Sequence, residues 1–354
     1  MIGGSYLSPL SFFFSLPHNG VMQNPDPHDE VLPYFLAAAL ALAPLYGRNA
    51  TFQALFALCA LLFLLRDPPR FEKSHFPFFA FFGLAALSLI YSINRFHTLG
   101  GLALLSCCFL GFCLAASLER KKLADAVILA GLFVEIAAVL LFVHDSLRYP
   151  DPFWGGPFYR TNDLAGFLMI VIPVALSRLL SSEKKLRAQL LPALVSGLGI
   201  AVWFATWSRA GWFAGFVGLL VWFFLAGRSS WKKILPVLLL GLTLTLVFSH
   251  GHDPVSRISS LAPANLKKPT ENSLVWRANL WQNGKSIALA HPVLGTGYST
   301  FSDALPAYQT RAGFFAHDAH NHFLQLFSEL GGLGLLFFSS FLFLLFGKAW
   351  QNRK

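Results

Sequence analysis

The sequence predicts an all-helical integral membrane protein with about ten transmembrane helices. Of its 354 residues, 55% are hydrophobic and only 12% are charged, and the mean hydropathy is +0.56. A soluble chain of this length needs more polar surface. The net charge of +10 would suggest a nucleic-acid partner in a soluble protein. Here we expect it to reflect basic loops that face anionic membrane lipids, and no nucleic-acid partner.

Apolar stretches of roughly 15 to 24 residues predict ten spans, nine within residues 31–248 and the last within 322–346. Residues 1–30 are predicted to be a cytoplasmic lead-in without a cleaved signal, because the apolar run 6–16 is too short to span. Residues 249–321 form one long loop, and 347–354 form a cytoplasmic tail. The predicted spans are 31–46, 51–65, 76–91, 99–118, 123–143, 164–180, 190–207, 210–226, 234–248 and 323–346.

Basic residues predict the orientation. Sixteen lysines and arginines lie in loops on one side, and five lie in the short loops opposite. The positive-inside rule makes the richer side cytoplasmic, together with both termini. The six basic residues of the loop 249–321 do not count, because long loops are exempt from the rule. The protein is expected in the inner membrane of a bacterium, and this loop is therefore predicted to face outward, into the periplasm.

The long loop contains recognisable elements. Thr270 is a plausible N-cap of a helix that runs to Ala290 and that Pro292 would end. Arg277 and Trp281 are four residues apart and share a face of this helix. The segment 295–301 is predicted to be a glycine turn, and it precedes the polar segment 316–322.

Ionisable residues inside predicted spans are costly, by about 2.5 to 3.5 kcal/mol at the centre of a helix on insertion scales. Glu135 and Glu329 are the clear cases, and each is either a paired or protonated packing residue or a functional one. Arg209 lies at the outer boundary between two spans, where it is either a snorkelling residue or a phosphate ligand. Arg160 precedes the sixth span, whose start Asn162 or Asp163 could cap.

Two chemistries are open to the histidines before the last span. In the first, one histidine acts as a general base while arginines stabilise a departing pyrophosphate. In the second, His317, Asp318, His320 and His322 bind a divalent metal, with His317 and His320 on one helical face and His322 projecting elsewhere. A solvated loop with idle histidines is the third interpretation. The arginines predicted on the same outer face are Arg160, Arg209 and Arg277.

The loop before the last span ends with His320 and Asn321, which are followed by nine residues, Gly331, two residues and Gly334. This pattern resembles the signature of the O-antigen ligase and O-antigen polymerase family. Three other pieces of the chain are similar to the family, namely 161–168, 207–211 and 277–281 followed by 291–301. The resemblance covers roughly the second half of the chain.

The resemblance implies a GT-C-like membrane glycosyltransferase that needs no metal and no cofactor. Its donor would be a glycan on undecaprenyl pyrophosphate, and its acceptor a hydroxyl of the lipid A core or of another molecule, as in lipopolysaccharide and polysaccharide biosynthesis. It also implies that His320 is the catalytic histidine and that Arg209 and Arg277 contact the pyrophosphate. We expect Arg160 to join these arginines. The expected supporting residues are His317, Asn321 and Glu329.

Two alternatives remain open from the sequence. A polymerase would use the same donor chemistry to join repeat units on the carrier. A transporter or channel would use Glu135 and Glu329 to line a polar route through the helices.

Overall fold

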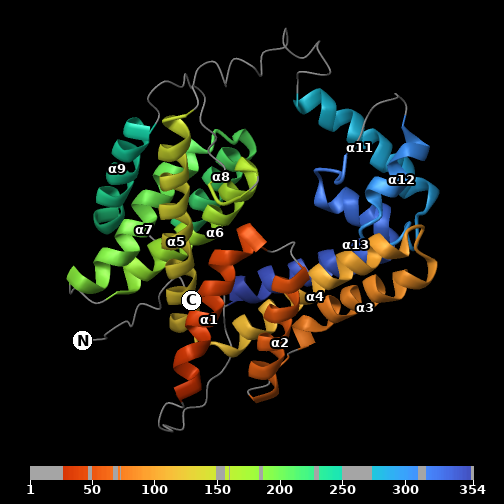
Figure 1. The fold of residues 1–354 in the computed structure, drawn as a ribbon, viewed down its shortest axis with the longest axis horizontal. Coiled ribbons are helices and arrows are strands. Elements are labelled where there is room, and N and C mark those ends of the chain that lie inside the picture. The colour runs from red at the N-terminus through yellow and green to blue at the C-terminus, as the bar shows by residue number, and fades with distance from the viewer. Residues whose placement is uncertain are drawn as a thin grey trace. The chain divides into compact units, whose positions relative to one another are not determined.

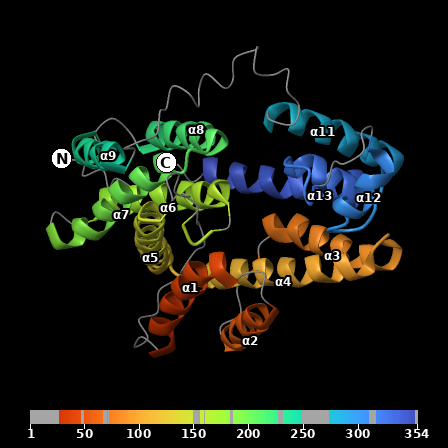
Figure 2. The same ribbon diagram turned by 45° about the horizontal axis from the view of Figure 1, so that its top comes forward.

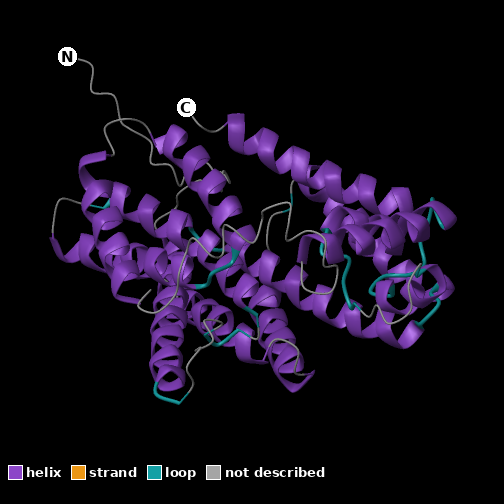
Figure 3. Cartoon of the chain, turned by 90° about the horizontal axis from the view of Figure 1, so that it is seen from above, coloured by secondary structure: helices purple, strands orange, loops and turns teal. Residues whose placement is uncertain are grey.

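The computed structural model describes residues 27–46, 50–66, 71, 73–148, 156–158, 160–182, 186–226, 231–248, 273–309 and 316–351. These residues form helices and connecting loops, with no strand among them (Figure 3). The chain divides into two compact units. Unit 1 comprises residues 1–69, 111–252 and 349–354, and unit 2 comprises residues 70–110 and 253–348.

Each of the ten predicted spans contains a helix. By length and composition, six helices of the described residues can cross a membrane, so ten crossings remain a prediction. The six candidates lie within 73–91, 95–117, 120–146, 161–181, 186–205 and 322–348. The helices are α1 (Pro27–Tyr46), α2 (Ala50–Arg66), α3 (Phe76–Tyr91), α4 (Arg95–Ser117), α5 (Arg120–Ser146), α6 (Thr161–Ser181), α7 (Leu186–Ala205), α8 (Arg209–Ala226), α9 (Trp231–Phe248) and α13 (His322–Gln351).

Unit 1 is built around α6 and α7 (Figure 1). Helix α7 packs against α5, α6 and α9, while α8 packs against α6 and α1 packs against α5. Leu164, Leu168, Ile172 and Leu176 are buried and recur every four residues, so they form one face of α6 that lies in the core. This face fixes the N-terminal end of α6, where Arg160 of the predicted site lies.

Unit 2 contains α3, the first part of α4, α11 (Ser273–Ala290), α12 (Phe301–Tyr308) and α13. The predicted helix of the long loop is confirmed as α11, although Thr270 lies outside the described residues. The short helix α12 was not predicted. Phe301 and Leu305 of α12 are buried against Leu280 and Ala319, and this packing stabilises a helix too short to persist alone. Figure 2 shows α12 beside α11 and α13.

Candidate active site

Helix α13 is broken at Gly331, whose backbone angles are φ 64° and ψ −165°. The loop that follows α11 fills this break and satisfies backbone groups that the broken helix leaves open. Irregular backbone at membrane depth needs such partners, because no water is available there. Four backbone hydrogen bonds join loop and break, from Thr296 to Ser328 (3.1 Å), from Gly297 to Glu329 (2.8 Å), from Gly332 to Pro292 (2.8 Å) and from Leu333 to Val293 (3.4 Å).

The break turns the chain sharply. The ring centroids of His322 and Phe338 are 5.0 Å apart. In a straight helix, sixteen residues would separate them by about 24 Å. The sequence predicts one span over 323–346, which by length and composition remains a candidate span, and the structure adds that it consists of two helical pieces whose rings meet across the break at Gly331. Only glycine fits at the turn, because a Cβ on Gly331 would overlap the Val293 carbonyl and because φ is positive.

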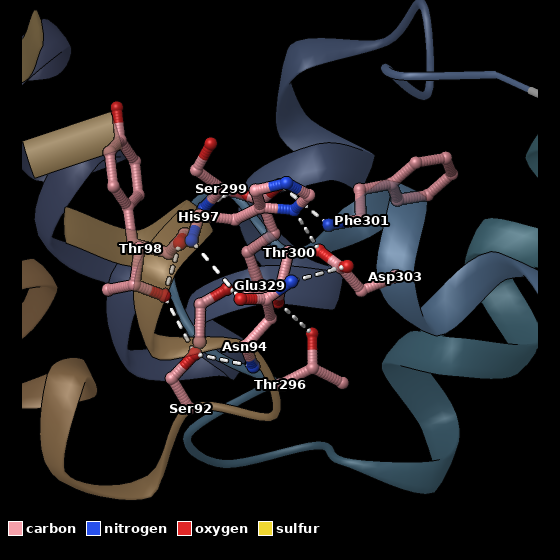
Figure 4. Close-up of polar contacts among 12 residues, drawn as sticks. Ser92, Asn94, His97, Thr98, Thr296, Ser299, Thr300, Phe301, Asp303 and Glu329 are labelled. Carbon is pink, nitrogen blue, oxygen red and sulfur yellow. Dashed lines mark hydrogen bonds and ion pairs between the residues drawn. The ribbon is translucent and has the colours of Figure 1, made fainter. Parts of the chain in front are cut away.

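The Glu329 carboxylate is buried at the break, with 2% of the residue exposed. It accepts hydrogen bonds from the backbone N–H of Ser299 (2.8 Å) and of Phe301 (3.1 Å), at the start of α12. It also accepts one from Gln325 Nε2 (2.7 Å). Of the alternatives open from the sequence, Glu329 is therefore paired. Figure 4 shows the carboxylate at the centre of this polar cluster.

Tyr298 borders the same turn. Its backbone N–H donates to Ser88 Oγ (3.0 Å), and its ring meets the ring of Phe81 edge-on, with centroids 6.4 Å apart. Burial raises the pKa of the Tyr298 phenol above its usual value, and the nearby Glu329 carboxyl adds to the shift. The phenol is therefore protonated at neutral pH, and its ring acts as part of the core of unit 2.

Gln325 connects Glu329 to the loop 316–321, which carries His317 and His320 and is called the histidine loop below. Its Oε1 accepts a hydrogen bond from the Ala319 N–H (2.6 Å), and the Ala319 carbonyl accepts one from Trp281 Nε1 (3.0 Å). Both backbone groups of the residue before His320 are thus fixed. The sequence analysis did not identify Gln325. Its signal was a polar side chain four residues before Glu329 on an apolar helix, where the two share a face.

His320 lies at the end of this network. Its side chain is exposed, and its ring meets the edge of the Trp276 ring with centroids 5.2 Å apart. Its backbone φ is 50°, in the left-handed region that residues with a Cβ rarely adopt but that His tolerates better than most. Such a strained residue persists only where its surroundings hold it, and these positions concentrate at functional sites. The structure therefore holds this imidazole in an unusual, exposed conformation.

Asn321 and His317 have different settings. Asn321 Oδ1 accepts from the Leu324 N–H (3.2 Å), so this side chain caps the start of α13. His317 is exposed in a loop that is not helical. The prediction that His317 and His320 share a helical face is therefore wrong, because α13 begins only at His322. Among the described residues, no group of three His, Cys, Asp or Glu is arranged to hold a metal ion.

Arg277 belongs to the beginning of α11. It follows Trp276, whose ring contacts His320, and it is partly buried. Trp281, one helical turn after Arg277, donates a hydrogen bond to the Ala319 carbonyl. The first turns of α11 therefore bring together the Arg277 guanidinium and the contacts of Trp276 and Trp281 with the loop 316–321.

Arg209 is the first residue of α8 in unit 1, and it is partly buried. Ser208 caps α8, because its Oγ accepts from the Gly211 N–H (3.0 Å). The same Oγ donates to Asn162 Oδ1 (2.6 Å) at the start of α6. Two helix N-termini therefore meet here, and both carry the partial positive charge of a helix start.

Arg160 is the N-cap residue of α6, with an extended backbone and no side-chain cap. The expectation that Asn162 or Asp163 caps this helix is wrong, because both lie inside the first turn, after the N-cap position Arg160, and Asn162 Oδ1 bonds to Ser208 instead. Arg160 and Arg209 thus begin the two helices that the Asn162–Ser208 bond joins. Arg277 and His320 belong to unit 2.

Residues 194–339 match the family model described as O-antigen ligase. The match begins within α7 and ends within α13, beyond the break at Gly331, and it includes Arg209, Arg277, His320 and Glu329. Neither the curated proteins nor the solved structures gave a match. Arg160 lies outside the matched residues, which make up less than half of the 354-residue chain, and over these residues the chain is similar to the O-antigen ligase family.

Proposed function

We propose that this membrane protein transfers a glycan from undecaprenyl pyrophosphate to an acceptor hydroxyl, in the manner of an O-antigen ligase. The reaction would take place at the periplasmic face of a bacterial inner membrane, and the lipid A core is the expected acceptor. The observation that carries the proposal is the presentation of His320, whose side chain is exposed and whose backbone is strained, next to Ala319, whose N–H and carbonyl are both held by hydrogen bonds.

In this mechanism His320 is the general base. It removes the proton of the acceptor hydroxyl as that oxygen forms a bond to the anomeric carbon of the glycan. The bond between that carbon and the pyrophosphate oxygen breaks, and its electron pair leaves with the pyrophosphate. This leaving group is already activated, so the step as written uses only groups of the protein.

The negative charge of the leaving group needs cationic partners. Arg209 and Arg160 supply guanidinium groups at two joined helix N-termini, and both features favour phosphate oxygens. Arg277 supplies a third guanidinium next to the residues that contact His320. Glu329 and Asn321 support the site by holding α12 and the start of α13, and His317 lies in the same exposed loop.

The test is transfer of a carrier-linked glycan by purified variants. His320→Asn tolerates the left-handed backbone but is not a base, so we expect transfer to fall by about a hundredfold or more. Arg209→Gln should also lose most of its transfer activity. Arg148→Gln is the control, because this exposed arginine follows the end of α5, and the variant should retain transfer. Near-normal transfer by inserted His320→Asn would remove this residue from the mechanism.

The acceptor decides between ligase and polymerase. In a deletion strain, a ligase leaves lipid A without glycan and the carrier-linked chains at normal length. A polymerase leaves single repeat units instead. The break in α13 does not favour the transport alternative, because the open backbone groups there bind the loop 292–297 of the same chain. Solute uptake that persists in His320→Asn would favour it.

A further inference from the structure

A second histidine of unit 2 is held by a carboxylate. His97 Nδ1 lies 2.7 Å from Asp303 Oδ2, although 206 residues separate the two in sequence. The side chain of His97 is 49% exposed, whereas that of Asp303 is 22% exposed. Figure 4 shows this pair beside the Glu329 cluster, at the junction of α4 and α12.

Asn94 completes the pair. Its Nδ2 donates to Asp303 Oδ1 (2.8 Å), and its Oδ1 accepts from the His97 N–H (3.2 Å), which caps α4. Asn94 therefore already links α12 to the start of α4. The imidazole of His97 is not needed for that link, and half of its surface remains open to a ligand.

The hydrogen-bond pattern fixes what His97 can bind. A carboxylate accepts only, so Nδ1 carries the proton in its bond to Asp303. In the neutral form of the ring the lone pair is then on Nε2, which can accept a hydrogen bond, and a carboxylate behind the ring strengthens that acceptor. The ligand group it suits is a hydroxyl. The adjacent Phe96 is 82% exposed, which adds an apolar face of the kind that the C–H surface of a sugar ring can cover.

The short helix α12 relates this pair to His320. Asp303 belongs to its first turn, and Glu329 binds the backbone N–H groups of Ser299 and Phe301 at its start. The buried face of α12 packs against Ala319, the neighbour of His320. A helix of eight residues is about 12 Å long. The pair and the histidine loop therefore lie on two faces of one small element, within the reach of a glycan of a few sugars.

We propose that His97, oriented by Asp303, binds a sugar hydroxyl of a saccharide substrate. The proposal rests on the proposed function, and it makes His97 a binding residue rather than the base. The hydroxyl belongs either to the glycan on the carrier or to the acceptor saccharide. The KM values of the two substrates distinguish these sources.

The experiment uses the purified full chain with each substrate varied in turn. His97→Ala loses one hydrogen bond, so the KM of one substrate should rise about tenfold while kcat changes little. His97→Gln keeps a donor for Asp303 and an acceptor for the hydroxyl, and it should retain most of the affinity. His144→Ala is the matched control, because this histidine is 52% exposed and also bonds to an aspartate, Asp145. Its KM values should not change.

A purely structural role predicts a different result. If His97→Ala lowers the melting temperature and kcat together while both KM values stay constant, His97 only connects α4 to α12 and the proposal is wrong. A fall in kcat alone would make His97 a catalytic group and would also overturn it.

Binding separates this proposal from the proposed function. The probes are undecaprenyl pyrophosphate with and without a glycan, and the readout is tryptophan fluorescence of the detergent-solubilised protein. A wild-type chain that binds neither probe contradicts both proposals. If the wild-type chain binds both probes, one of two results is expected for His97→Ala. If His97 binds the glycan on the carrier, the variant should bind the glycan-bearing carrier more weakly and the bare carrier as before. If His97 binds the acceptor, the affinity for both carriers should stay unchanged and only the affinity for the acceptor saccharide should fall. Equal loss of both carriers, or no loss of any saccharide ligand, would contradict the sugar site and leave the proposed function standing.

Discussion

Two glutamates lie buried in predicted membrane spans, and their surroundings differ completely. Glu329 in unit 2 accepts three hydrogen bonds, from two backbone N–H groups and one side-chain amide. Glu135 in unit 1 is fully buried in α5, and neither of its carboxylate oxygens has a hydrogen-bond partner among the described residues. In the sequence the two are alike, each a single acidic residue in an apolar run. The comparison shows that depth alone does not define the role of a buried carboxyl.

The two carboxyls are expected to do different work. Glu329 collects donors from α12 and α13, so it fixes the position of elements that carry the site. Glu135 packs opposite Gly199 of α7, where a Cβ would come within 2.6 Å of Oε1. A charge without a partner at that depth would be costly, so Glu135 fits the interpretation as a neutral packing residue. The predictions below test this contrast, beginning with the largest expected effect.

Glu329→Ala should have the largest effect. It leaves the N–H groups of Ser299 and Phe301 and the amide of Gln325 without their acceptor. Each unsatisfied buried donor costs about 1 to 3 kcal/mol, so the variant should lose several kcal/mol of stability and most transfer. The measurements are the melting temperature in detergent and the transfer rate. Unchanged values would show that the carboxylate does not organise the site.

Gly331→Ala should have the next largest effect. The new methyl group would overlap the Val293 carbonyl, and the left-handed backbone would cost about 1 to 2 kcal/mol more. We expect a lower melting temperature and slower transfer, since the turn and the loop 292–297 support each other. Gly347→Ala in the same helix is the control, because a Cβ there meets nothing within 4 Å. Equal behaviour of the two variants would contradict the role of the break.

This break also marks where sequence reasoning ends. Periodic apolar runs predicted the helices, and the sequence placed His320 and Glu329 in the candidate site. The run 322–346 gave no sign of a turn, because glycines within apolar helices are common. The turn exists only because the distant loop 292–297 supplies partners for its backbone groups. That pairing is tertiary, so no local pattern encodes it.

The same limit explains the other misses. Helix α12 has eight residues, and its stability comes from burial of Phe301 and Leu305 rather than from a long periodic pattern. The His97–Asp303 pair joins residues 206 positions apart. Gln325 was accessible to sequence reasoning, because it lies one helical turn before Glu329. Spacing within one helix is readable in the sequence, whereas contacts between elements are not.

Gly199→Ala should destabilise unit 1 by about 1 to 3 kcal/mol through overpacking, less than the loss at Glu329. The added methyl group meets the Glu135 carboxyl and the Ile172 side chain. Glu135→Ala should relieve part of this cost, so the double variant should be more stable than the sum of the single effects predicts. Gly218→Ala is the matched control, because its Cβ would meet nothing within 4 Å. Additive effects in the double-mutant cycle would show that the two positions do not interact.

Glu135→Gln should have the smallest effect. Glutamine has nearly the same shape and no charge, and the carboxyl forms no hydrogen bond among the described residues that the change would remove. We therefore expect the stability to change by no more than about 1 kcal/mol and transfer to stay within twofold of wild type. Glu329→Gln is the sharp comparison, because one carboxylate oxygen becomes an amide NH2 group, which would face either the Ser299 N–H or the donors of Phe301 and Gln325. If Glu135→Gln instead abolished transfer while the protein stayed folded, this carboxyl would have to ionise or exchange a proton during the reaction. The contrast between the two glutamates would then be one of chemistry as well as of hydrogen bonding.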